Sequence, residues 1–140
     1  MNRKLLTLLL IMVVAAATIT VVSAAETVTV NGVEFNVPDG FKSQPESDQM
    51  GYVAYNGEGK IAFLDSDNGT AVILGVLDNN GGVSLDDIKN SNSSYIDKTI
   101  AGKDGIIADN GKTLSFIYIE NDKLMTIYAP TESLLEETIK

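Results

Sequence analysis

Five Asn-Gly dipeptides constrain how this chain can fold more than any other feature of its sequence. Asparagine and glycine both tolerate the positive φ angles that the tight turns of β-hairpins require. Apolar residues alternate with polar ones on both sides of the first pair, as in two strands that each bury one face. The five pairs begin at Asn31, Asn56, Asn68, Asn80 and Asn110. These five turn positions predict a protein built mainly of antiparallel hairpins.

The apolar runs between these turns predict about seven to nine short strands. They are expected at 27–30 and 33–37, at 51–56, 60–65 and 70–78, at 95–100 and 103–109, and at 112–120 and 123–129. The run Ala71-Val72-Ile73-Leu74 is apolar without interruption. A strand that is apolar on both faces is typical of a central position, so we expect this one to be covered on both sides.

Two helices are expected beside the sheet. Ser84, with Asp87 three residues later, resembles a capping box, and the polar run 90–94 ends the helix that follows. Near the C-terminus, Pro130 stops the last strand and the next residue, Thr131, can cap a helix that continues to Lys140. That second helix is expected to bury Leu135 and Ile139. The expected fold class is α+β: an antiparallel sheet with two helices packed on it, after an N-terminal signal helix.

The N-terminus is typical of an exported protein. Arg3 and Lys4 precede 18 apolar-leaning residues, 5–22, and the small residues Ser23 and Ala24 follow. This pattern predicts a signal peptide, 1–24, cleaved after Ala24. The alternative is an uncleaved membrane anchor, because 18 residues lie at the lower limit for spanning a bilayer. In both cases residues 25–140 form a single extracytoplasmic domain, secreted or held at the cell surface.

Composition excludes several classes of function. Residues 25–140 carry eight basic and 19 acidic side chains, a net charge of −11 that repels nucleic acid. The chain has no cysteine, so an exported domain folds without disulfides. It also has no histidine, which removes the commonest general base and the usual zinc ligand. We therefore expect no catalytic residues and no cofactor.

The stretch Asp65-Ser66-Asp67-Asn68-Gly69 resembles the start of a calcium loop. An EF-hand requires glycine at position 6 and a bidentate glutamate at position 12, where this chain has Thr70 and Val76. The sequence therefore favours a hairpin turn. A partial metal site that uses Asp65, Asp67 and a distant carboxylate is the alternative.

Three further patterns are candidate sites. Asn68 and Asn92 each lie in an Asn-X-Ser/Thr sequence, the acceptor pattern for N-glycosylation. Asp86 and Asp87, or Asp65 and Asp67, could serve as paired acids for glycoside hydrolysis, but the first pair also suits the positive end of a helix dipole. The five tyrosines are expected to pack in the core for the most part, with one or two on a binding face.

A family resemblance adds to this interpretation. The run from Val30 to Phe41, VNGVEFNVPDGF, resembles the NGxxFxxPxGF opening of small exported archaeal proteins of unassigned function. The later run from Lys98 to Gly105, followed by a hairpin and a closing helix, is similar to their second half. The order of strands and helices also resembles the PsbP-like fold. That resemblance implies an extrinsic binding or assembly module and brings no catalytic residues.

The sequence thus predicts a non-enzymatic extracytoplasmic binding or assembly domain. Its expected partner is a protein or an envelope component of unknown identity, with no nucleic acid, and it meets the membrane only through residues 5–22 if the leader is uncleaved. The alternatives are a carboxylate- or metal-dependent hydrolase, which needs converging acids in a cleft, and a calcium-stabilised structural domain.

Overall fold

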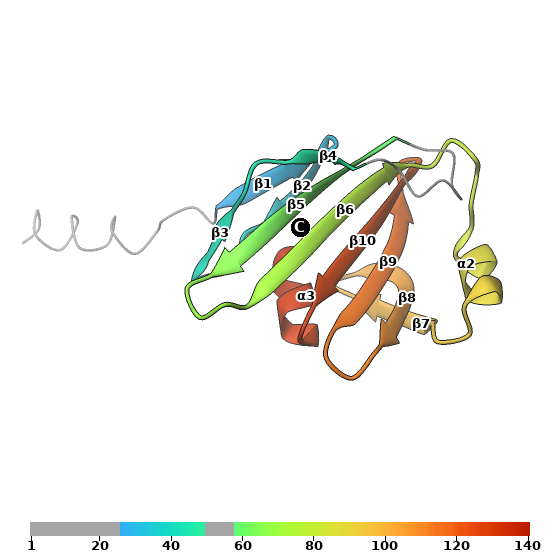
Figure 1. Ribbon diagram of the computed structural model, residues 1–140. Helices are drawn as coiled ribbons and strands as arrows, with labels where there is room; N and C mark the ends of the chain where they lie inside the picture. The colour runs from blue at the N-terminus through green and yellow to red at the C-terminus, as the bar shows by residue number, and fades with distance from the viewer. Residues whose placement is uncertain (1–25, 50–57) are drawn as a thin grey trace, which may run out of the picture.

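The computed structural model describes residues 26–49 and 58–140, which form ten strands and two helices (Figure 1). The strands are β1 (Thr27–Val30), β2 (Val33–Asn36), β3 (Phe41–Ser43), β4 (Ser47–Gln49), β5 (Gly59–Ser66), β6 (Ala71–Asp78), β7 (Ile96–Ile100), β8 (Lys103–Asp109), β9 (Leu114–Glu120) and β10 (Lys123–Ala129). The helices are α2 (Leu85–Ser91) and α3 (Glu132–Thr138). Neither helix has the length and apolar character that crossing a bilayer requires.

Eight strands form one antiparallel sheet, in the order β3-β5-β6-β10-β9-β8-β7, with β4 also paired to β5. The strands β1 and β2 form a separate hairpin. In the large sheet β10 pairs with β6 along one edge and with β9 along the other, so it joins the two halves. The α+β class and the antiparallel sheet are confirmed.

The large sheet has eight described strands, within the predicted range of seven to nine. Its composition differs from the prediction, because β1 and β2 form a separate hairpin and β3 and β4, of three residues each, were not expected. Both are short edge strands held by pairing with β5, so little in their own sequence marks them. The strand expected at 51–56 and the signal helix lie outside the described residues.

Three of the five Asn-Gly pairs, at Asn31, Asn68 and Asn110, lie in hairpins as predicted, whereas Asn80-Gly81 joins β6 to α2 and Asn56-Gly57 lies outside the described residues. Asn31 and Gly32 have φ angles of 46° and 80° between β1 and β2, as tight hairpin turns require. Asn121 and Asp122, at 53° and 61°, make the same kind of turn between β9 and β10 without a glycine. Asparagine and aspartate tolerate this backbone region better than other side chains do.

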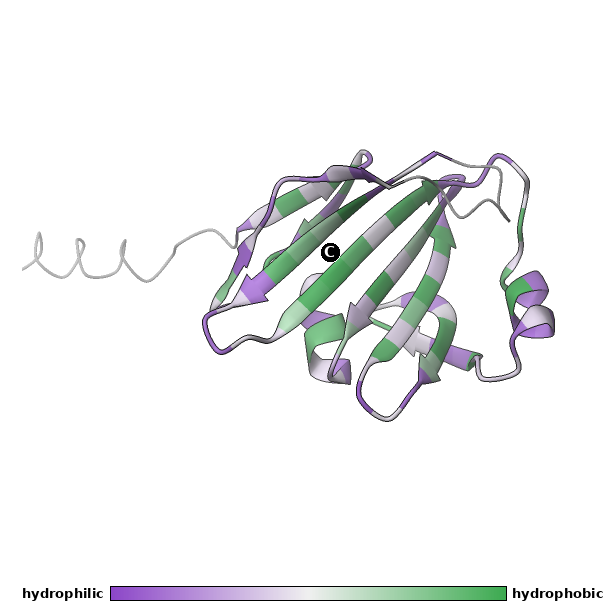
Figure 2. Ribbon diagram, in the orientation of Figure 1, coloured by the Kyte–Doolittle hydropathy of each residue, from purple (hydrophilic) through white to green (hydrophobic). Residues whose placement is uncertain are grey.

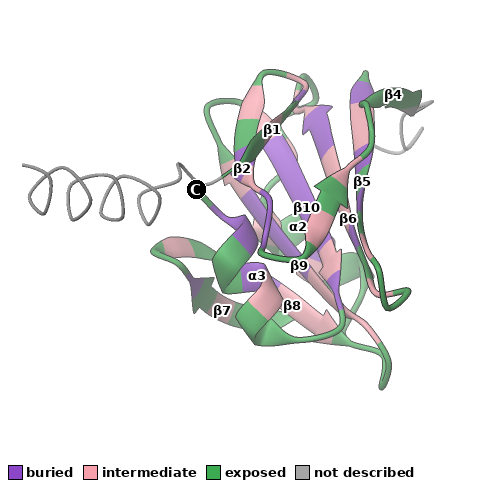
Figure 3. Ribbon diagram, turned by 90° about the vertical axis from the view of Figure 1, so that its left-hand side faces the viewer, coloured by how far each residue is buried: buried purple, intermediate pink, exposed green. Residues whose placement is uncertain are grey.

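The main core lies on one face of the sheet, under the β1–β2 hairpin and α3 (Figure 3). Phe35 of the hairpin and Leu135 of α3 are both fully buried there, which confirms the prediction for Leu135. The buried residues of the main core are Val30, Phe35, Val37, Ala62, Leu64, Val72, Leu74, Val76, Ile100, Phe116, Tyr118, Met125, Ile127, Ala129, Leu135 and Ile139.

The last helix ends earlier than predicted. It stops at Thr138 instead of continuing to Lys140, because Ile139 is extended and forms a β-bridge with Phe35. Ile139 is buried as expected, only 5% exposed. The C-terminal residues therefore fasten α3 to the β1–β2 hairpin.

The helix α2 lies on the opposite face, against β8 and β9. Its capping box is confirmed: the Ser84 backbone N–H donates to Asp87 Oδ2 at 2.9 Å, and the Asp87 N–H donates to Ser84 Oγ at 3.1 Å. The helix ends at Ser91 and so includes Asn90 and Ser91, two residues of the run that was expected to be a loop. Beneath it a second, smaller core contains Leu77, Ile88, Ile106, Ile117 and Leu124.

Candidate binding pocket

The described residues cover only part of the face of the sheet that carries α2. Cross-strand pairing places Phe63 opposite Ile73, and Ile73 opposite Tyr128, along one row of this face. The row beside it contains Ile61 and Gly75. Phe63 is 40% exposed and the other four are half-buried. We call these five residues the open face.

The open face corrects one prediction about β6. We expected the apolar run Ala71–Leu74 to be covered on both sides. Val72 and Leu74 are fully buried in the main core, whereas Ile73 is only half-buried on the open face. Figure 2 shows that β6 is apolar along most of its length. The described residues therefore bury β6 on the main-core side, whereas on the other face they bury Leu77 and leave Ile73 partly exposed.

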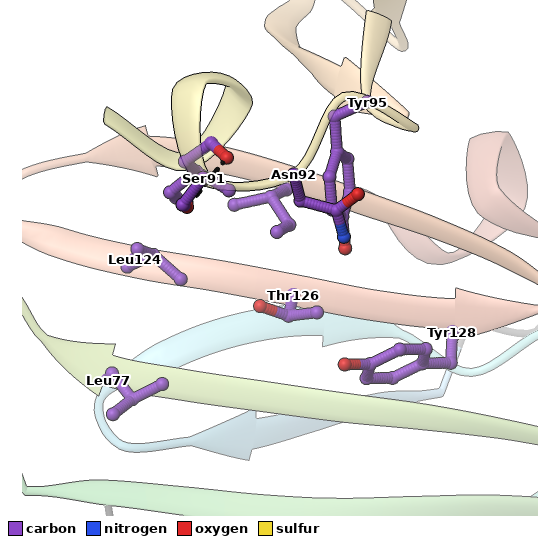
Figure 4. A pocket seen from close by; sticks show the side chains of 9 residues that line it. Leu77, Ser91, Asn92, Tyr95, Leu124, Thr126 and Tyr128 are labelled. Carbon is purple, nitrogen blue, oxygen red and sulfur yellow. Dashed lines mark hydrogen bonds between the residues drawn. The ribbon is translucent and has the colours of Figure 1, made fainter. Parts of the chain in front are cut away.

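A pocket of about 170 Å³ lies where α2 and the loop after it meet this face of the sheet. Figure 4 shows Asn92 and Tyr95 pointing down from the loop toward Thr126 and Tyr128, which rise from β10. The lining residues are Leu77, Ile88, Ser91, Asn92, Tyr95, Ile117, Leu124, Thr126 and Tyr128. The pocket adjoins the open face through Tyr128, which belongs to both.

Several polar groups around the pocket are held in place by hydrogen bonds. The hydroxyl of Tyr95 lies 2.9 Å from Ser115 Oγ on β9. Ser91 Oγ donates to the Ile88 carbonyl at 3.0 Å, and Asn92 Oδ1 accepts from the Ser94 N–H at 3.0 Å. These bonds fix the loop that forms one wall, so the pocket is preformed rather than assembled by a ligand.

The pocket is electrically neutral. Its nine lining residues include hydroxyls and one amide but no carboxylate, amine or imidazole. A hydroxyl becomes a useful nucleophile only beside a base that takes its proton, and no such base lines this cavity. The arrangement suits the binding of an uncharged group that has an apolar body and a polar edge.

The size of the pocket limits what enters it. Ligand sites for drug-sized molecules have volumes of roughly 300–1,000 Å³, whereas an apolar cavity of about 150 Å³ accepts benzene. At about 170 Å³ this pocket matches a single ring or a branched aliphatic side chain.

The two acids of the possible calcium loop lie apart from this pocket. Asp65 lies near the end of β5, where Gln44 Nε2 donates to its Oδ2 at 3.3 Å, and Asp67 is exposed in the turn. Ser66 and Thr70 close the β5–β6 hairpin through an N–H to carbonyl bond of 2.9 Å, which confirms the turn. Within the two described stretches, no three acidic side chains are grouped as a metal site would need. Metal binding by Asp65 and Asp67 stays a prediction.

The glycosylation patterns fall at two exposed positions. Asn68 lies in the β5–β6 turn, where its Oδ1 accepts from the Thr70 N–H at 3.1 Å. Asn92 is the C-cap of α2 and lines the pocket. Glycosylation at either residue stays a prediction, but only a glycan on Asn92 would stand beside the pocket.

The adjacent acids of α2 have structural partners. Asp87 is the carboxylate of the capping box, and the backbone N–H that Ser84 donates lowers the pKa of Asp87 below its usual range. Asp86 lies 3.3 Å from the ammonium of Lys89 within the same helix. Both arrangements fit the helix-dipole interpretation of these acids.

The pocket itself was not expected from the sequence. Of the described tyrosines, Tyr118 is buried in the main core, whereas Tyr95 and Tyr128 line the pocket. The prediction that one or two tyrosines serve a binding face pointed in this direction without naming them. Thr126, only 5% exposed, gave no signal because a threonine in a strand is ordinary. Tyr52 and Tyr55 lie outside the described residues.

Known proteins add no functional assignment to this geometry. Comparison of the chain with protein-family models, with curated proteins and with solved structures finds no match.

Proposed function

We propose that this chain is a non-enzymatic extracytoplasmic domain that binds a protein or an envelope component through the pocket beneath α2. The observation that carries the proposal is a preformed neutral pocket that adjoins the open face, on which Phe63 is exposed. Apolar surface that a sheet leaves uncovered is typical of interaction sites. We propose further that residues 1–24 direct export, so that the domain is secreted or held at the cell surface.

The hydrogen bonds around the pocket favour binding over catalysis. The hydroxyls of Tyr95 and Ser115 are paired with each other, and Ser91 donates to a carbonyl of its own helix. Each of these groups is therefore occupied in stabilising the wall of the pocket. Fixed polar groups around an apolar cavity orient a ligand at low entropic cost.

The position of the pocket suits a domain attached at its N-terminus. The described chain begins at Glu26, beside β1, and α2 lies at the opposite side of the large sheet (Figure 1). A partner bound beneath α2 would thus approach from the side away from residue 26.

The test is a titration of isotopically labelled residues 25–140 with phenol, followed by amide chemical shifts. Phenol carries one ring and one hydroxyl, so we expect shifts concentrated at Ser91, Tyr95 and Thr126. Thr126→Ile replaces the hydroxyl by an ethyl group that enters the cavity, and it should weaken phenol binding at least tenfold, equivalent to about 1.4 kcal/mol. Thr126→Val keeps the volume and is the matched control, with a much smaller loss.

Two results would contradict the proposal. Phenol could leave the pocket resonances unmoved, or Thr126→Ile and Thr126→Val could bind phenol equally well. Turnover of glycosidic, ester or peptide substrates by the purified domain would also overturn the non-enzymatic assignment.

A further inference from the structure

We infer that the group bound in the pocket is an aromatic side chain of a protein segment that carries lysine or arginine residues on both sides of it. This inference rests on the proposed function and names its partner. It is carried by three features: the dimensions of the pocket, the surplus of carboxylates on the same side of the sheet, and the aromatic rings of the open face.

The pocket accepts one ring and no more. Leu77, Ile88 and Leu124 provide apolar walls, and Thr126 and Tyr128 add hydroxyl groups from β10 (Figure 4). An aromatic ring buries a large apolar area at low cost in conformational entropy, which is why such rings anchor protein interfaces. The rest of the segment would continue over the open face, which adjoins the pocket at Tyr128.

Carboxylates outnumber lysines on this side of the sheet. Strand pairing places the side chains of Asp65, Asp97 and Asp104 on the same face as the pocket, and α2 adds Asp86 and Asp87. The lysines there are Lys42, opposite Asp65, and Lys89 of α2.

The ammonium of Lys89 is already shared between two carboxylates. It lies 2.7 Å from Asp97 Oδ1 and 3.3 Å from Asp86 Oδ1, so it offers little attraction to an acidic partner. A cationic segment meets a complementary potential on this face, whereas an anionic one is repelled.

The rings of the open face add a second attraction for cations. Phe63 on β5 and Tyr128 on β10 lie in one cross-strand row with Ile73 between them. Strands are spaced about 4.8 Å apart, so the two ring positions are separated by roughly 10 Å. Lysine and arginine side chains that flank an anchored ring can lie over these rings in cation–π contact.

The experiment compares three peptides titrated into residues 25–140 and followed by amide chemical shifts. They are acetyl-Lys-Lys-Phe-Lys-Lys-amide, the same peptide with alanine in place of phenylalanine, and acetyl-Glu-Glu-Phe-Glu-Glu-amide. We expect the first to shift the resonances of the pocket and the open face. The alanine peptide should bind at least tenfold more weakly, the glutamate peptide should not bind measurably, and added salt should weaken the first peptide.

Matched variants locate the binding surface. Phe63→Ala should weaken the basic phenylalanine peptide severalfold, whereas Ile96→Ala, at a residue 64% exposed on the other face, should not. The double variant Asp65→Asn and Asp104→Asn should weaken this peptide but leave phenol binding unchanged. Its control removes two exposed carboxylates of α3, Glu136→Gln and Glu137→Gln, and should have no effect.

The outcomes separate this inference from the proposed function. If phenol binds in the pocket but the lysine and glutamate peptides bind equally, the basic-partner inference is wrong and the binding function stands. If the peptides shift only residues on the α3 side, the inference is also wrong. If neither phenol nor any peptide moves the pocket resonances, both proposals fall.

Discussion

At the scale of single residues, the close approach of β8 to β9 depends on a glycine. A Cβ atom at Gly105 would lie 2.4 Å from the Ile117 carbonyl oxygen and 2.7 Å from Cζ of Phe116. Gly105→Ala should therefore lower the free energy of unfolding by about 3 kcal/mol. Gly75→Ala is the matched control, because its Cβ would meet nothing closer than the Thr126 carbonyl oxygen at 3.8 Å. Urea unfolding of both variants checks this, and equal losses would contradict it.

Tyr118 gives a second prediction at this scale. Its burial, helped by the charge of Glu120, raises the pKa of Tyr118 to about 12. Because this folded-state pKa lies above the value near 10 of an unfolded chain, its contribution to stability is complete below pH 10. That contribution falls as the pH rises toward 12. An absorbance titration should show a late-ionising phenol that Tyr118→Phe removes.

At the scale of elements, α2 links stability to binding. Ser84→Ala removes the N-cap and should lower the free energy of unfolding by about 1 kcal/mol. Since α2 forms one wall of the pocket, the variant should also weaken phenol binding and speed hydrogen exchange in the helix. Thr131→Ala removes the corresponding cap of α3, whose side chain accepts from the Leu134 N–H at 3.3 Å. Thr131→Ala should lower the free energy of unfolding by a similar amount without changing the affinity for phenol.

The capping box also makes α2 sensitive to acid. Hydrogen bonds from Ser84 lower the pKa of Asp87 in the folded protein. The ionised Asp87 carboxylate therefore stabilises the fold, and this contribution to stability is present above the unfolded pKa near 4. It is lost as the pH falls through the lowered folded value. Hydrogen exchange in α2 should therefore rise at acid pH in the wild type. An Asp87→Asn variant should show a smaller change over the same range.

Elements were predictable from the sequence where their chemistry is local. The turn at Asn31-Gly32 and the capping box of α2 depend on residues a few positions apart. In contrast β3 and β4 form only because β5 lies beside them, and α3 ends early because Ile139 meets Phe35. The pocket was missed for the same reason. Its lining comes from β6, α2, the following loop, β9 and β10, which only the complete sheet brings together.

At the scale of the whole molecule, charge repulsion opposes folding. Residues 25–140 have a net charge of −11, and the ion pairs seen in the structure lie at least partly exposed. Exposed pairs contribute only about 0–1 kcal/mol each, so salt should relieve more repulsion than it removes attraction. Raising sodium chloride from about 0.02 to 0.5 M should raise Tm. A fall in Tm would show that the ion pairs dominate.

The position of β10 affects the whole sheet. Without residues 123–129, β6 and β9 would each lose one paired edge, and Met125 and Ile127 would leave the main core. A chain ending at Asp122 should therefore lack cooperative unfolding and dispersed amide resonances. A chain truncated after Lys112 also lacks β9, and it should likewise show neither cooperative unfolding nor dispersed amide resonances. A folded spectrum from either truncation would contradict this prediction.

The same strand order determines when the domain can fold. The strand that comes last in the described chain fills the middle of the sheet, so a polypeptide that crosses a membrane N-terminus first cannot close either core until residues 123–129 have emerged. Long-range pairing of this kind is slow to form. On the proposal that residues 1–24 direct export, we expect the domain to fold only after β10 has crossed the membrane.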